Sequence, residues 1–131
     1  MMLLKPLMTM AFVAAASTSV AGMKWEKRVL LVSAPDATNP SLAEQRRSLA
    51  QWRAGAEARD LVVVEVLGDR VSGASDKAAT LRQRYGLSPN GFTAVLIGKD
   101  GGVKLRKTRP LTAAVLEDTI DAMPMRREGK R

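Results

Sequence analysis

Three short apolar runs, rich in β-branched residues, alternate with longer segments of mixed polarity along this chain. They cover residues 29–32, 61–67 and 93–97. The middle run is apolar at both alternating positions except at Glu65, a composition typical of a strand that is covered on both faces. The three runs therefore predict buried strands of one sheet.

The segment between the first two runs has the pattern of an amphipathic helix. A capping-box sequence, Ser41 to Glu44, follows Pro40, and apolar residues recur beyond it at helical spacing up to about Arg59. A strand, a helix and a second strand covered on both faces predict a right-handed βαβ unit with parallel strands.

The rest of the chain predicts a second helix, a hairpin and a last helix. After a Gly/Ser-rich loop at 68–75, a helix capped by Ser75 or Asp76 is expected to end at Gly86. The Asp-Gly pair at 100–101 separates the third run from residues 103–106, which predicts an antiparallel hairpin. The last helix should begin at Thr112 and end at Pro124. The predicted order is β-α-β-α-β-β-α, with a mixed four-stranded sheet.

The first residues favour a cleaved export signal. Lys5 precedes an apolar stretch at 7–16, and the small residues Ser19 and Ala21 stand three before and one before a predicted cleavage after Ala21. We expect a signal peptide at 1–21, one domain at 22–124 and a basic tail at 125–131. The location would be periplasmic or secreted, with no transmembrane segment after cleavage.

The chain contains no cysteine and no histidine. Thiol–disulfide exchange, cysteine nucleophiles, Ser-His-Asp triads and the common Cys/His zinc sites are therefore excluded, and nothing else indicates a cofactor or a metal. Without Lys5, the 21 Lys and Arg become 20, against 13 Asp and Glu, a net charge of +7. This charge favours an envelope protein or an anionic surface as partner. Nucleic acid is disfavoured, because the few aromatic residues fall in predicted structured positions.

A resemblance to a known family is carried by five stretches: residues 25–32, 60–69, 81–86, 91–106 and 120–127. In order and spacing they resemble the DUF4174 family, bacterial domains of unknown function with relatives among animal extracellular-matrix proteins. The resemblance implies a thioredoxin-like fold, an α/β protein built as a three-layer α/β/α sandwich. It implies no established activity.

The position of the thioredoxin redox pair holds no sulfur in this chain. In thioredoxins a Cys-x-x-Cys pair follows the first strand, and the corresponding stretch here, residues 37–40, reads Ala-Thr-Asn-Pro. Thioredoxins also place a cis-proline just before the third strand, where this chain has Gly91 and Phe92. The resemblance therefore carries over neither the redox chemistry nor the substrate docking of thioredoxins.

Polar residues at the carboxyl end of the first strand form the first candidate site. Ligands commonly bind at that end of an α/β sheet, and helix amides there can hold an anion. Alternatively, Asn39 and Ser41 simply cap the following helix. The candidate ligand-binding residues are Asp36, Thr38, Asn39, Phe92 and Thr93.

Two further features are charged. Glu65 interrupts a buried run, so it is expected to form an ion pair, with Arg28, Arg82 or Arg84, or to lie exposed near the strand end. Unpaired, it would be a candidate general acid or base. A second feature is a basic cluster near the carboxyl terminus that is a candidate binding surface or simply a solvated face. Its members are Lys104, Arg106, Lys107, Arg109, Arg126, Arg127, Lys130 and Arg131.

These observations favour an exported, non-catalytic, thioredoxin-like binding module. One alternative is a thiol-independent enzyme that uses polar residues at the carboxyl end of the sheet. A second alternative is a chaperone-like subunit that stabilises another envelope protein.

Overall fold

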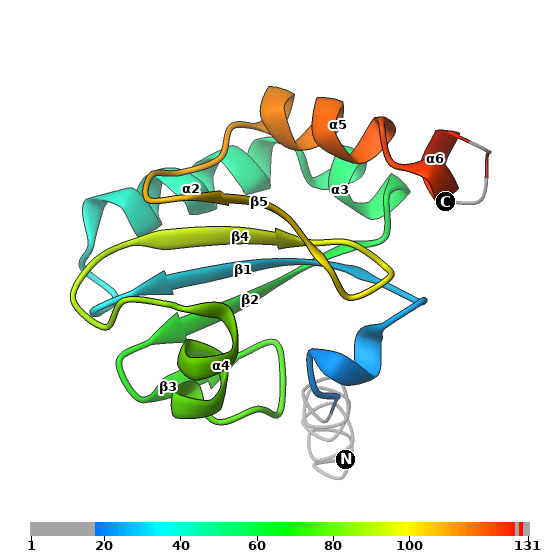
Figure 1. Cartoon of the computed structure of the whole chain (residues 1–131). Helices are drawn as coiled ribbons and strands as arrows, with labels where there is room; N and C mark the ends of the chain where they lie inside the picture. The colour runs from blue at the N-terminus through cyan, green and yellow to red at the C-terminus, as the bar shows by residue number, and fades with distance from the viewer. Residues whose placement is uncertain (1–17, 128, 130–131) are drawn as a thin grey trace, which may run out of the picture.

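A mixed five-stranded sheet forms the centre of the molecule in a computed structural model that describes residues 18–127 and 129 (Figure 1). The strands lie in the order β3-β2-β1-β4-β5. They are β1 (Arg28–Ala34), β2 (Leu61–Leu67), β3 (Arg70–Ser72), β4 (Thr93–Ile97) and β5 (Val103–Lys107).

The strand pairing confirms the predicted topology apart from the strand count. Strands β1 and β2 are parallel, from Arg28 opposite Leu61 to Ala34 opposite Leu67, and β4 pairs antiparallel with both β1 and β5. The prediction of four strands was wrong, because β3 lies within the expected loop at 68–75 and pairs antiparallel with the end of β2. A three-residue strand with two exposed residues has too little apolar periodicity to predict.

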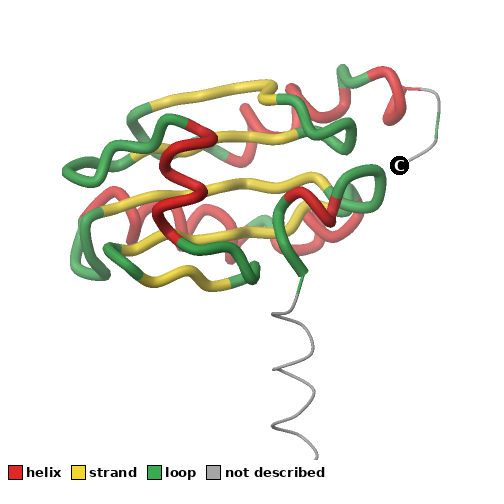
Figure 2. Tube along the Cα trace, turned by 60° about the horizontal axis from the view of Figure 1, so that its bottom comes forward, coloured by secondary structure: helices red, strands yellow, loops and turns green. Residues whose placement is uncertain are grey.

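Helices cover both faces of the sheet. Helices α2 (Pro40–Gln51), α3 (Arg53–Ala58) and α5 (Ala113–Asp121) cover one face, and α4 (Ala78–Tyr85) crosses the other, which faces the viewer in Figure 2. A 3₁₀ turn, η1 (Ala21–Met23), precedes β1, and α6 (Pro124–Arg127) follows α5. None of the helices in the described part of the chain is long and apolar enough to cross a membrane.

Three helix boundaries differ from the predictions. The first helix is interrupted at Trp52, whose φ of −112° breaks the helical path into α2 and α3. The N-cap of α4 is Lys77, because Asp76 instead accepts a hydrogen bond from the amide of Val20. Helix α5 ends at Asp121, and Pro124 begins α6 rather than ending a helix. The predicted stop at Gly86 is confirmed by its φ of +65°.

Alternation along the strands divides the core into two layers. Even-numbered positions of β1 and β4 pack against α2 and α5, and odd-numbered positions pack on the α4 side. The first layer includes Leu30, Val32, Leu42, Leu96, Leu116 and Ile120, and the second includes Leu31, Val64, Leu81, Val95 and Ile97. Loops connect the strands and helices at the two ends of the sheet. We call these ends the amino end and the carboxyl end, after the direction of β1.

Candidate functional sites at the two ends of the sheet

The loop that follows β1 at the carboxyl end satisfies its own polar groups. Asp36 Oδ1 accepts hydrogen bonds from the amide of Thr38 at 2.9 Å and from its hydroxyl at 2.5 Å. These bonds, the hydroxyl's foremost, lower the pKa of Asp36. Asn39 Oδ1 accepts from the amides of Ser41 at 3.0 Å and Leu42 at 3.2 Å. Asn39 is therefore the N-cap of α2, and its side chain takes the place an anion would occupy.

The five predicted ligand-binding residues are not brought together. Phe92 packs into the core layer beneath α2 and α5. Thr93 is 5% exposed and, by alternation with Ala94, lies on the α4 side of β4. Of the five, Asp36 lines the cavity beside this loop. Phe92, just before β4, and Thr93, its first residue, therefore lie on opposite faces of the sheet.

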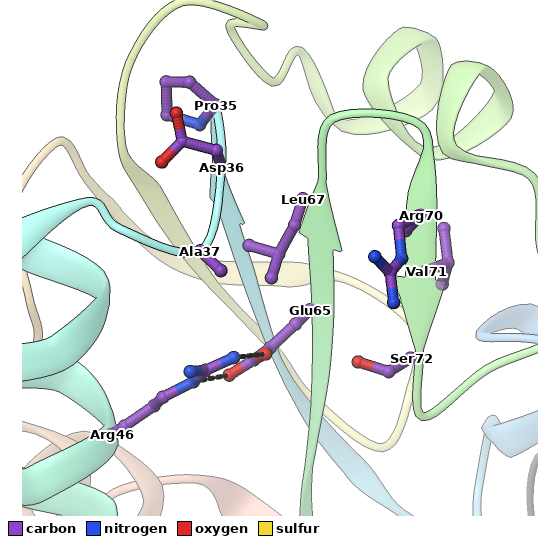
Figure 3. Close-up of a pocket in the computed structure, with 9 residues that line it drawn as sticks. All are labelled: Pro35, Asp36, Ala37, Arg46, Glu65, Leu67, Arg70, Val71 and Ser72. Atoms are coloured by element: carbon purple, nitrogen blue, oxygen red, sulfur yellow. Dashed lines mark hydrogen bonds and ion pairs between the residues drawn. The ribbon is translucent and has the colours of Figure 1, made fainter.

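A cavity of about 420 Å³ opens at the carboxyl end between α2, β2 and β3 (Figure 3). Its charged lining comes from Asp36, Arg46, Glu65 and Arg70, and Ser72 adds a hydroxyl. Arg46 donates from Nη2 to Glu65 Oε1 at 2.6 Å and from Nε to Oε2 at 2.9 Å. This hydrogen bonding raises the pKa of Arg46. Both oxygens of Glu65 are thus engaged, so it has the structural role of an ion-pair partner.

The predicted ion pair between Glu65 and Arg28 was wrong. In the strand register Glu65 lies opposite Val32, four residues along β1 from Arg28. Arg28 is 1% exposed at the amino end, where its Nη1 donates to the carbonyl of Arg59 at 2.7 Å and its Nε to Met123 Sδ at 3.4 Å. Burial lowers the pKa of Arg28. Arg28 therefore belongs to the opposite end of the molecule.

A second cavity, of about 220 Å³, opens at the amino end. Its apolar lining is Trp25, Met123, Pro124 and Met125, and its polar lining is Arg28, Lys99, Asp100 and Lys104. These residues come from the segment before β1, the β4–β5 hairpin and the start of α6, which meet at this end of the sheet (Figure 1). The cavity wall thus combines apolar side chains with three cations and one carboxylate, which suits a ligand that carries an apolar group.

Trp25 is the most unusual residue of this cavity. Its side chain is 59% exposed and its φ is +72°, in the left-handed region that bulky residues rarely adopt. Its amide donates to the carbonyl of Lys99 at 2.6 Å, and the ammonium of Lys24 lies 5.4 Å from its ring centroid. The structure thus holds a large aromatic ring at the surface against both its conformational and its hydrophobic preference.

Several charged residues lie near Trp25. Lys99 and Lys104 are paired, with Asp60 at 2.8 Å and Asp100 at 2.9 Å respectively. The Lys104 hydrogen bond lowers the pKa of Asp100. Among the described residues, Lys24 and Lys27 form no ion pair. Together with Arg84 they line a neighbouring cavity of about 240 Å³. We call the set formed by Lys24, Trp25, Lys27, Lys104 and Met125 the Trp25 surface.

The structure describes the side chains of five of the eight residues in the basic cluster predicted near the carboxyl terminus. Lys104, Arg106 and Lys107 lie on the edge strand β5, where cations protect an edge from pairing with another chain. Arg109 follows β5 and is exposed. Arg126 turns inward, donating to Asp121 at 3.4 Å and to the carbonyl of Ala58 at 3.1 Å. The side chain of Arg127 and residues Lys130 and Arg131 lie outside the described part of the chain.

Comparison with known proteins assigns the chain to a family. The family described as Domain of unknown function (DUF4174) matches residues 19–129. The chain belongs to this family. The match confirms the family resemblance expected from the sequence, and it covers residues 19–129.

Two relatives illustrate how far the comparison extends. Coiled-coil domain-containing protein 80 of Danio rerio is 24% identical over 127 residues, which cover 80% of this chain and 15% of that protein. A solved structure from Chlorobium tepidum, described as a thiol:disulfide interchange protein DsbE, matches with a TM-score of 0.55 and 21% identity. That match covers 73% of this chain and 79% of the other. The thioredoxin-like fold is thereby confirmed.

The DUF4174 domain thus combines a thioredoxin-like fold with a chain that has no cysteine. Residues 37–40, where the resemblance places the thioredoxin redox pair, form the turn and the cap that begin α2. Sequence reasoning located this stretch but missed the Trp25 surface. The sequence offers one sign of this surface, a tryptophan with lysines at 24 and 27 just before the first strand. The exposure of this tryptophan depends on a backbone conformation that residue type does not predict.

Proposed function

We propose that this DUF4174 domain is an exported, non-catalytic binding module that holds an acidic segment of another protein at the Trp25 surface. The observation that carries the proposal is the exposed, conformationally strained Trp25 at the edge of an apolar cavity. On either side of it in the sequence are Lys24 and Lys27, which form no ion pair among the described residues. Export is supported by the charged, apolar and small residues at the start of the chain.

Two non-glycine residues of the described chain have positive φ, and only one has a full structural explanation. Asp60 has a φ of +53°. Its carboxylate pairs with buried Lys99, and its carbonyl accepts a hydrogen bond from the amide of Arg28. The backbone of Trp25 makes one hydrogen bond, and the residue stays 59% exposed at the edge of the cavity, with Lys24 beside its ring. Strain of this kind is commonly found at binding sites. A ligand that covers the ring would explain its position.

The chemistry of the surface favours an acidic peptide segment. Lys24 and Lys27 flank Trp25 and outnumber Glu26, while Arg28 adds a buried positive charge at the cavity wall. A concave cavity of about 220 Å³ accepts an inserted apolar side chain, which favours a protein segment over a flat membrane surface. Charge complementarity would then orient carboxylates toward the lysines.

The alternative of a thiol-independent enzyme receives less support. That alternative requires Asp36, Thr38, Asn39 and Thr93 to converge on an open pocket. Thr38 and Asn39 instead make local turn and cap hydrogen bonds, and Thr93 is buried. The carboxyl end therefore offers structural polar groups rather than an assembled set of reacting groups.

The proposal is tested by calorimetric titration of the purified domain with two peptide pools. One pool carries a central apolar residue flanked by Asp and Glu, and the other carries the same centre flanked by Lys and Arg. We expect binding of the acidic pool only, weakened by salt. Trp25→Ala and the pair Lys24→Glu with Lys27→Glu should each weaken binding at least about tenfold, roughly 1.4 kcal/mol.

A matched control uses two exposed arginines on the far helices. Arg47→Glu with Arg53→Glu changes the net charge equally, and these positions lie on α2 and α3. This variant should bind the acidic pool within about twofold of the natural chain, because short-range charge matters most. Equal loss in both pairs would show a non-specific charge effect. Binding only to anionic lipid vesicles would replace the protein ligand with a membrane surface.

A further inference from the structure

Residues on both sides of the predicted cleavage after Ala21 are part of the folded domain. The carbonyl of Thr18 accepts a hydrogen bond from the amide of Ser75 at 3.0 Å. The amide of Val20 donates to Asp76 Oδ1 at 2.8 Å. Val20 is 4% exposed, and it lies with Met23 in the core layer beside α4. The segment before Gly22 therefore contributes both to the core and to the hydrogen bonds of the loop before α4.

Cleavage after Ala21 would remove these contacts. It would take Val20 out of the core and leave the amide of Ser75 and the carboxylate of Asp76 without the partners described above. It would also remove the carbonyl of Val20, which accepts from the amide of Met23 at 3.1 Å within η1. Because each loss is unfavourable, a domain cut at this position would be less stable than one that keeps Thr18 and Val20.

The family match supports the same boundary. The DUF4174 match begins at residue 19 and therefore includes Ser19, Val20 and Ala21. The matched region thus starts before the predicted cut. Two independent observations, the packing of Val20 and the start of the family match, place the residues just before Gly22 within the domain.

We infer that the export signal is cleaved after Ala16 rather than after Ala21, an inference that rests on the export proposed above. Ala14 and Ala16 stand three before and one before this bond, and residues 7–13 supply an apolar stretch of sufficient length. A signal peptidase would add water across the Ala16–Ser17 peptide bond. Ala16 then carries the new carboxylate and Ser17 the new amino group, so Val20 stays in the mature chain.

The first test is N-terminal sequencing of the full chain, expressed with a carboxyl-terminal tag in a Gram-negative host. The periplasmic protein should begin at Ser17. Ala16→Tyr should cause the precursor to accumulate, because a bulky residue blocks the position before the cut. The matched variant Ala21→Tyr, at an exposed position of the fold, should be processed like the natural chain.

The outcomes separate this inference from the function it rests on. A periplasmic chain that begins at Gly22, or an Ala21→Tyr precursor that accumulates, would overturn the cleavage position while leaving export and peptide binding intact. An uncleaved chain in the cytoplasm would overturn both this inference and export. Binding of the acidic pool is measured on purified protein and does not depend on either result.

A second test compares two chains made directly in the cytoplasm, one beginning at Ser17 and the other at Gly22, each behind an initiator methionine. The shorter chain should melt at least about 5 °C lower, because it lacks buried Val20 and three hydrogen bonds made by Thr18 and Val20. Equal melting temperatures would remove the structural reason for the upstream cut and overturn the inference.

Discussion

The two ends of the sheet use their unusual residues in opposite ways. At the carboxyl end, Asp36, Asn39 and Glu65 are each bound by a neighbouring group of the same chain. At the amino end, Trp25 stays exposed and strained beside an apolar cavity. At the end where thioredoxins carry out redox chemistry, these three polar residues are thus paired within the chain, whereas the opposite end exposes a strained aromatic ring. A fold alone therefore does not locate a site.

The largest expected effect tests how firmly the carboxyl end is held. Gln45 of α2 is fully buried and makes two hydrogen bonds to the backbone of Leu111. Its side chain accepts from the Leu111 amide at 2.7 Å and donates to the Leu111 carbonyl at 2.9 Å. Gln45→Leu leaves both groups unsatisfied, so the free energy of unfolding should fall by about 2–4 kcal/mol. Urea denaturation measures this change. The exposed control Gln51→Leu should change it by less than about 0.5 kcal/mol.

The second prediction separates the two strained residues of the amino end. Trp25→Gly should leave stability unchanged or raise it by up to about 1 kcal/mol, because glycine adopts positive φ without strain. It should abolish binding of the acidic pool. Asp60→Gly relieves similar strain but removes the partner of buried Lys99, so it should destabilise by about 2 kcal/mol. Thermal denaturation distinguishes the two. A destabilised Trp25→Gly would assign the tryptophan a structural role.

The third prediction concerns the ion pairs that anchor α6 at the amino end. Two arginines, Arg59 and Arg126, hold Asp121, and the hydrogen bonds from Arg59 are the main cause of its lowered pKa. Because the folded pKa lies below the unfolded value of about 3.9, the stabilisation is complete above that pH and is lost as the pH falls through the folded pKa.

Asp121→Asn therefore should lower stability at pH 7 by less than about 1 kcal/mol, since the carboxylate is 43% exposed. The gap, which is the difference in free energy of unfolding between variant and natural chain, should begin to close below about pH 4. Denaturation at several pH values measures this gap. Asp118→Asn, at an exposed position on the same helix, should show no gap at any pH. A gap for Asp121→Asn that shows no decrease as the pH falls below the unfolded pKa of about 3.9 would contradict an electrostatic origin.

Elements with strong local signals could be predicted from the sequence. The apolar runs gave β1, β2 and β4 because burial on both faces requires continuous hydrophobicity. The Asp-Gly pair placed the β4–β5 hairpin, and Thr112 caps α5 as expected. In contrast, β3 is too short for a pattern, and the residue types around Trp52 give no signal for the break in the helix at that residue.

The sites depended on tertiary placement and were therefore predicted less well. Glu65 was correctly expected to form an ion pair, but its partner is Arg46, 19 residues earlier on α2. Arg82, one of the expected partners, instead donates to the carbonyl of Gly68. Which helix residue faces a strand residue is set by packing across the layers, and residue spacing does not give it. The exposure of Trp25 follows likewise from tertiary structure.

The smallest expected effect tests whether the ion pair between Arg46 and Glu65 at the carboxyl end has only a structural role or belongs to a ligand site. Arg46 is 50% exposed, so Arg46→Ala and Glu65→Gln should each cost less than about 1 kcal/mol of unfolding free energy. Combining them should reveal a coupling of about 0.5 kcal/mol in a double-mutant cycle. Neither change should alter binding of the acidic pool, since the pair lies at the other end of β2. Loss of that binding in Arg46→Ala, with folding intact, would move the binding site to the 420 Å³ cavity and reverse the roles of the two ends.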